Sequence, residues 1–178
     1  MFKTIAIILV LAVVAILIYA TTRPDTLHVQ RSITIKAPPE TIFPQIDTLG
    51  NWRQWSPYEK YDPAMKRTFE GPAGGQGAAY AWDGSSKVGA GRMEIIESAP
   101  SSKVVFKLDF MRPFEAHNTA TFTLLPNADG TTVTWAMDGP APYINKLMGI
   151  FFNMDEMIGK DFAAGLASLK TLTEAAGA

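Results

Sequence analysis

The sequence contains no cysteine among its 178 residues and only two histidines, His28 and His117. The absence of cysteine excludes disulfide bonds, thiolate nucleophiles and cysteine-ligated metals. A metal site would need both histidines together with nearby carboxylates, and no local spacing in the chain supplies such a set. We therefore expect neither a metal site nor a bound cofactor.

The sequence also lacks clustered charge and the common catalytic motifs. Sixteen Lys and Arg stand against 17 Asp and Glu, and no run of like charges occurs. Because a nucleic-acid partner requires a concentrated basic face, none is expected. The glycine-rich stretches 71–77 and 89–91 lack the Lys-Ser/Thr pair of a phosphate-binding loop, and no G-x-S-x-G motif is present. No catalytic residue is predicted from a motif.

One long hydrophobic run is present, over residues 4–20. Its length is near the lower limit for a spanning helix, for which about 20 residues are usual, and exceeds the apolar core of a signal peptide. Ile18 occupies a position where signal cleavage prefers a small residue. We therefore expect residues 1–25 to form an uncleaved single-pass membrane anchor, with a cleaved export signal as the alternative. Lys3 favours a cytoplasmic amino end and an extracytoplasmic domain.

Residues 26–178 are expected to form one domain, monomeric when soluble, of the α+β class. Alternating apolar residues predict strands, and prolines and polar clusters separate them. Pro44 is expected to end or distort the first short helix early. Apolar residues at helical spacing from Ile144 to Leu169 predict one long amphipathic helix. The expected order is a strand near 27–36, short helices near 38–46 and 51–58, antiparallel strands near 65–70, 77–82, 89–97, 103–111, 116–125 and 131–138, and the long helix.

This order of elements resembles the START/Bet v 1-like (SRPBCC) superfamily, specifically the bacterial polyketide cyclase/dehydrase and lipid transport-type proteins. The resemblance implies a helix-grip fold, in which a curved antiparallel sheet wraps around a long C-terminal helix, preceded here by one N-terminal hydrophobic helix. In relatives, a cavity between sheet and helix binds lipids, sterols, hormones or polyketides. The residues that carry the resemblance are Arg31-Ser32-Ile33, Ala37-Pro38-Pro39-Glu40, Trp52 through Lys60, Asp62-Pro63, Val88-Gly89-Ala90-Gly91 and Phe152-Asn153-Met154-Asp155 through Asp161-Phe162.

The expected function is that of a membrane-tethered or exported protein that binds a small apolar or amphipathic molecule, lipid-like or polyketide-like. A cyclase or hydrolase in the same cavity is one alternative, for which Glu59, Asp62 and Asn118 are the polar candidates. An interaction module whose interior is filled by its own side chains is the other. The cluster that contains Trp52, Trp55 and Tyr58 could pack one end of the barrel or contact a ligand.

Strand alternation and helix spacing predict which side chains face the cavity. We expect its open part to lie near Trp55 and to be poor in charge. The candidate ligand-binding residues are Trp52, Trp55, Trp82, Phe106, Leu108, Phe110, Asn118, Phe122, Trp135, Met137, Phe151, Met154 and Ile158.

Overall fold

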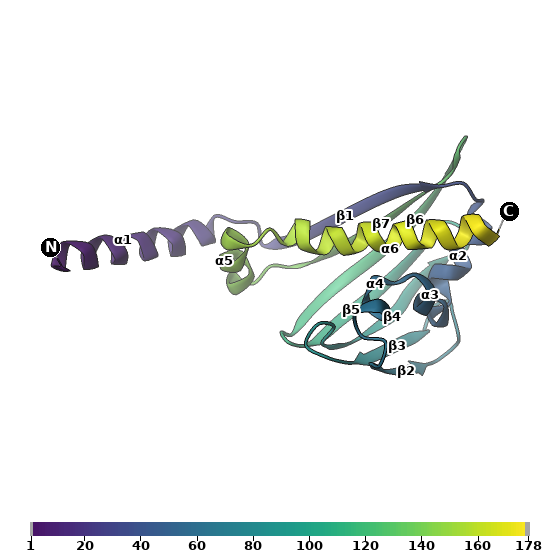
Figure 1. The fold of residues 1–178 in the computed structure, drawn as a ribbon, viewed down its shortest axis with the longest axis horizontal. Helices are drawn as coiled ribbons and strands as arrows, with labels where there is room; N and C mark the ends of the chain where they lie inside the picture. Colours follow the sequence, from purple (N-terminus) through teal and green to yellow (C-terminus); the bar gives the residue numbers. More distant parts are fainter. Residues whose placement is uncertain (1, 177–178) are drawn as a thin grey trace.

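A computed structural model describes residues 2–176, in which a long helix, α1 (Phe2–Thr21), projects from a domain of sheet and helices (Figure 1). Apart from Lys3, Thr4 and Thr21, the residues of α1 are predominantly apolar, and the helix is almost entirely exposed. At 1.5 Å per residue such a helix is about 30 Å long, which matches the hydrocarbon core of a bilayer. By length and composition, α1 could cross a membrane or act as a signal sequence.

The predicted sheet is confirmed, and it has seven antiparallel strands in the order β1-β7-β6-β5-β4-β3-β2. Side chains alternate as expected on β6, where Ala120, Phe122 and Leu124 are buried on the inner face. The strands are β1 (Thr26–Ile35), β2 (Lys66–Glu70), β3 (Ala79–Asp83), β4 (Ala90–Ala99), β5 (Lys103–Arg112), β6 (Ala116–Asn127) and β7 (Gly130–Pro140).

Short helices join β1 to β2, namely α2 (Pro39–Asp47), a 3₁₀ turn (Leu49–Asn51), α3 (Trp52–Trp55) and α4 (Pro57–Tyr61). The expectation that Pro44 ends or distorts α2 early was wrong about its end, because the helix continues to Asp47. Proline removes only its own N–H, and the Pro44 carbonyl still accepts hydrogen bonds from the Thr48 backbone (3.2 Å) and the Asn51 side chain (3.0 Å). These bonds stabilise the last turn.

The expected single long helix is two helices, α5 (Tyr143–Phe151) and α6 (Met154–Ala176). Phe152 is extended, with φ −126° and ψ 129°. Asn153 then accepts a hydrogen bond from the backbone N–H of Glu156 (3.1 Å), as a helix N-cap does. The chain turns at this cap, so the apolar period continues through the sequence while the helix does not.

The sheet grips α6, which confirms the α+β helix-grip fold. Phe162, Leu166 and Leu169 are buried against the sheet. Arg31 of β1 donates two hydrogen bonds to the Asp155 carboxylate, at 3.0 and 2.9 Å. Gly159 makes this contact possible, because a Cβ there would lie 2.0 Å from the Arg31 guanidinium. The start of α6 is thereby fixed to β1.

Candidate functional site

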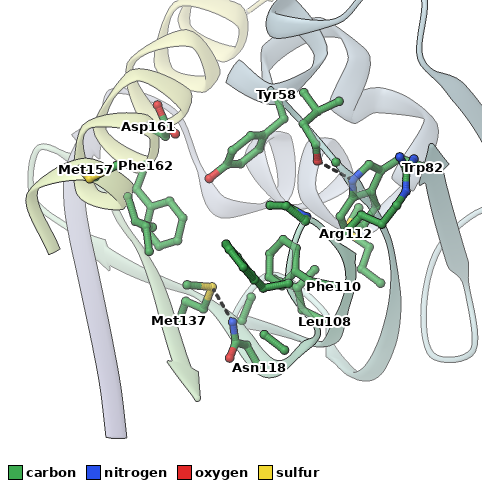
Figure 2. A pocket seen from close by; sticks show the side chains of 18 of the residues that line it. Tyr58, Trp82, Leu108, Phe110, Arg112, Asn118, Met137, Met157, Asp161 and Phe162 are labelled. Carbon is green, nitrogen blue, oxygen red and sulfur yellow. Dashed lines mark hydrogen bonds between the residues drawn. The ribbon is translucent and has the colours of Figure 1, made fainter. Parts of the chain in front are cut away.

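A cavity of about 620 Å³ lies between the inner face of the sheet and the helices α4 and α6. Figure 2 shows Leu108, Phe110 and Asn118 on the strands, facing Phe162 on α6. The deep wall is largely apolar and buried, and it consists mainly of Trp52, Met65, Tyr80, Met93, Phe106, Ala120, Trp135, Met137 and Phe162. The volume of the cavity is in the range of small-molecule sites, roughly 300 to 1,000 Å³.

The structure brings ten of the 13 candidate residues to the cavity wall. These are Trp52, Trp82, Phe106, Leu108, Phe110, Asn118, Trp135, Met137, Met154 and Ile158. Trp55 and Phe122 are fully buried in the core instead. Phe151 is 65% exposed, because the break at Asn153 separates α5 from the helix face on which it was expected.

One end of the cavity is closed by an aromatic cluster, which we define as Trp52, Trp55, Phe106, Phe122, Trp135 and Phe162. Trp135 and Phe162 stack with their ring centroids 4.1 Å apart and 8° between planes. The indole N–H groups of Trp52 and Trp55 donate to the carbonyls of Ile46 and Gln45, both at 2.8 Å. Unfilled space does reach the rings that pack on Trp55, since Trp52 and Trp135 line the cavity, but these anchored rings close the cavity to solvent at that end.

The opening lies at the opposite end of the cavity, which we call the mouth. Its exposed residues come from three segments: the β3–β4 loop, the β5–β6 turn and the region around the α5–α6 break. They include Lys87, Arg112, Phe114, Glu115, Phe152 and Met157. Phe114 is 71% exposed and Phe152 is 54% exposed. The mouth also carries charge, including Arg112, which pairs with Asp83; the expected lack of charge therefore does not hold at the rim.

Glu59, a buried carboxylate on the wall, belongs to a closed polar network. Arg67 donates to Glu59 through Nε (2.8 Å) and Nη2 (2.6 Å), and the Tyr80 hydroxyl donates to the other oxygen of Glu59 (2.8 Å). The side chains of Arg67 and Glu59 are only 12% and 7% exposed. The hydrogen bond to Glu59 raises the pKa of Arg67, so the guanidinium stays charged. Glu59 therefore neutralises a buried cation.

The other two polar candidates for an enzyme do not converge with Glu59. Asp62 lies outside the cavity wall, where its carboxylate accepts hydrogen bonds from the backbone N–H groups of Ser85 (2.7 Å) and Ala64 (3.2 Å). The bond from Ser85 is the main cause that lowers the pKa of Asp62. Asn118 does line the cavity, and its amide approaches the Met137 sulfur at 3.6 Å.

Tyr58, which belongs to the aromatic cluster noted in the sequence, and Asp161, which the sequence did not indicate as a site residue, form a polar position on the wall. The Tyr58 hydroxyl points into the space between α4, α6 and the sheet (Figure 2). Burial, followed by the charge of Asp161, raises the pKa of Tyr58, so the phenol stays protonated and can donate a hydrogen bond. Asp161 itself accepts a hydrogen bond from the Tyr61 hydroxyl at 2.5 Å. The aromatic-rich stretch from Trp52 was a signal for Tyr58, but only the packing of α4 places its hydroxyl.

Several further residues of the wall were also missed. Val88 and Phe114 lie on loops, and Met148, Phe152 and Met157 lie around the α5–α6 break. Leu27 lies near the start of β1. Among residues 2–176, no three His, Asp or Glu side chains form a group that could hold a metal ion.

Solved structures with the same fold come from several bacteria. A protein from Chromobacterium violaceum aligns with a TM-score of 0.60 and 16% identity, covering 85% of this chain and 99% of that chain. The Aha1 dimer from Colwellia psychrerythraea aligns with a TM-score of 0.60 and 18% identity, covering 83% and 96%. The di-domain ARO/CYC protein StfQ from the steffimycin biosynthetic pathway aligns with a TM-score of 0.65 and 12% identity, covering 86% of this chain and 52% of that chain.

At these identities the structures establish the fold alone. No curated protein sequence matches the chain. The family model for polyketide cyclase/dehydrase and lipid transport proteins matches residues 26–174, which span the whole sheet and nearly all of α6. The chain therefore belongs to the polyketide cyclase/dehydrase and lipid transport family.

Proposed function

We propose that this protein is a membrane-tethered binding protein for a small apolar or amphipathic molecule, lipid-like or polyketide-like, held between the sheet and α6. The observation that carries the proposal is the cavity of about 620 Å³, which is apolar at depth and open at one end. Desolvating an apolar ligand against such a wall contributes roughly 25 cal/mol per Å² of buried apolar surface. The family description, which includes lipid transport, supports this class of ligand.

The wall supports a ligand with one polar group. Tyr58 offers a neutral hydroxyl donor beside the apolar surface of Phe162 and Met137. A carbonyl or hydroxyl oxygen of the ligand would accept this hydrogen bond, while the rest of the molecule fills the apolar depth. A single donor orients an otherwise apolar ligand in a pocket of this kind.

The two alternatives are less well supported. An enzyme of the cyclase or hydrolase type needs titratable groups that converge on the substrate. Here Glu59 is bound by Arg67 and Tyr80, and Asp62 lies outside the wall. A module with a filled interior does not fit a cavity of this volume.

The membrane tether rests on α1. Its uncharged run, residues 4–20, is about 25 Å long and lies at the short end of what a spanning helix needs, and Lys3 on the amino side favours an extracytoplasmic domain. The alternative is export after cleavage near Thr21. Alkaline carbonate extraction of cell membranes separates the two, since a spanning chain stays in the pellet. A soluble mature chain that begins near Thr21 would contradict the tether.

Ligand binding is tested by native mass spectrometry of the full chain released from mild detergent. We expect a co-purified lipophilic adduct that disappears after solvent extraction. Ala120→Phe places a ring in the cavity and should reduce the adduct severalfold. Leu125→Phe is the matched control, because Leu125 is 69% exposed and away from the wall. Circular dichroism verifies that both variants fold. No adduct, or equal loss in both variants, would contradict the proposal.

A further inference from the structure

Helix α5 exposes large apolar side chains, although it belongs to the folded domain. None of its residues is buried. Ile144 is 58% exposed and Phe151 is 65% exposed, and neither lines the cavity. Lys146 is the one charged residue of the helix, and it pairs with Asp25. Exposed apolar surface of this kind indicates contact with a protein or a membrane.

The position of α5 argues for a membrane as the partner. α5 packs against the carboxyl-terminal end of α1, where the Tyr143 hydroxyl donates to the Leu17 carbonyl at 2.9 Å. The Ala141 N–H donates to the Asp25 carbonyl at 2.7 Å, which holds the start of β1 against the same segment. Figure 1 shows α5 running across the direction of α1. If α1 spans a bilayer, this crossing direction orients α5 along the plane of the membrane surface, where amphipathic helices bind.

The mouth of the cavity lies at this same end of the domain. Met148 of α5 and Phe152 after it belong to the cavity wall. On the other side of the mouth, the β5–β6 turn carries Phe114, and in Figure 1 this turn and α5 are both at the end of the sheet that is nearer to α1. The rim carries the basic residues Lys87 and Arg112, the latter paired with Asp83, together with Glu115. The apolar face of α5 and the opening are thus one continuous surface.

We propose that α5 and the β5–β6 turn dock on the surface of the bilayer that α1 crosses, so that the mouth opens onto the lipid and the cavity takes its ligand from the membrane. This inference rests on the tether in the proposed function. α1 brings the apolar surface to the bilayer, and burial of Ile144, Phe151 and Phe114 among the headgroups removes them from water.

The test uses the absence of cysteine, which allows a single cysteine to be labelled at a chosen position of the full chain. Ile144→Cys and Phe151→Cys place an NBD fluorophore on the face of α5 that lies outside the cavity. Leu125→Cys is the matched control, an equally exposed apolar residue near the β6–β7 hairpin at the far end of the domain. The variants are reconstituted in phosphatidylcholine and phosphatidylglycerol vesicles with or without a phospholipid that carries a nitroxide in its acyl chain.

We expect blue-shifted emission and at least twofold quenching by the nitroxide lipid at positions 144 and 151, and emission typical of water without quenching at position 125. Equal behaviour at all three positions would overturn the inference. Blue-shifted emission at 144 and 151 that the nitroxide lipid does not quench would also overturn it, because a second copy of the chain or another protein would then cover α5. A chain that does not float with the vesicles would overturn the tether as well.

The proposed ligand and the proposed membrane docking can be contradicted independently of each other. A lipophilic adduct in native mass spectrometry together with unquenched labels at 144 and 151 leaves the proposed ligand in place and overturns membrane docking. Quenched labels without any adduct support membrane docking and contradict the proposed ligand.

Discussion

The two ends of the cavity are built on opposite principles. At the closed end, Trp52, Trp55 and Trp135 are almost fully buried, and Trp135 packs edge to face with both of the others. At the mouth, Phe114 and Phe152 are also aromatic and apolar, but they are exposed, and charged side chains lie near them. The same residue types thus stabilise the fold at one end and remain available for contact at the other. Substitutions should affect stability at the closed end and binding at the mouth.

The largest expected effect follows from emptying the closed end. We expect residues 26–178 to fold alone as a monomer, and Phe162→Ala in that domain to lower the free energy of unfolding by about 3 to 5 kcal/mol, because it leaves a cavity beside Trp135. Phe114→Ala at the mouth should change it by less than about 0.5 kcal/mol. Urea unfolding followed by tryptophan fluorescence measures both. Equal losses would remove the distinction between the two ends.

The second-largest loss of stability is expected when the buried ion pair of Glu59 and Arg67 is broken. Glu59→Ala leaves the Arg67 guanidinium, whose side chain is 12% exposed, without its carboxylate, and should cost about 3 kcal/mol. The double variant Glu59→Met with Arg67→Met removes both charges and should recover most of that loss. Thermal and urea unfolding compare the two. A double variant as unstable as the single one would show that the pair is needed for more than charge compensation.

A smaller and local effect is expected at the α5–α6 break. Asn153→Ala removes the side-chain acceptor for the Glu156 N–H and should cost about 1 kcal/mol. Hydrogen exchange should accelerate in the first turn of α6 and stay unchanged around Leu166, which is buried at the closed end. Gln54→Ala, an exposed substitution, provides the reference. Acceleration along the whole of α6 would mean that the cap fixes the entire helix.

The smallest expected effect is on the pH dependence of stability, and it comes from the pair of His117 and Asp109 on the outer face of the sheet. The hydrogen bond with Asp109 raises the pKa of His117 above 6.5 and lowers that of Asp109 below 3.8. The raised His117 pKa stabilises the fold below about pH 6.5, and this contribution is lost as the pH rises through the raised value. The Asp109 contribution is present above about pH 3.8 and is lost as the pH falls through the lowered value.

An NMR titration of the His117 ring in the wild type and in Asp109→Asn measures this pair. The pKa of His117 should fall toward 6.5 in the variant, and the contribution of His117 to the pH dependence of stability above 6.5 should become smaller. Glu115, 3.4 Å from the same ring, and Lys107, which pairs with Asp109, remain in both proteins. An unchanged His117 pKa would assign the shift to Glu115.

The sheet and its inner face could be predicted from the sequence because alternation fixes which side chains share a face. Phe106, Leu108 and Phe110 reach the cavity wall for this reason. The location of the mouth could not be predicted in this way. It depends on where the indole groups of Trp52 and Trp55 find carbonyl acceptors on α2, which is a tertiary contact.

The α5–α6 break was missed for a different reason. Apolar spacing continues unchanged from Ile144 to Leu169, and periodicity alone cannot separate one helix from two with the same phase. The signal was nevertheless present as Asn153 followed by Glu156, the spacing of an N-cap and its third helical residue. This local pattern overrode the longer apolar period.

The connection between α1 and β1 limits the distance over which the domain can act. Only residues 22–25 separate the two elements, and even fully extended they span about 14 Å. Asp25 is in addition held by Ala141 and Lys146, which shortens the free length further. If α1 lies in a bilayer as proposed, the domain stays within this reach of that bilayer and cannot cross to a distant membrane.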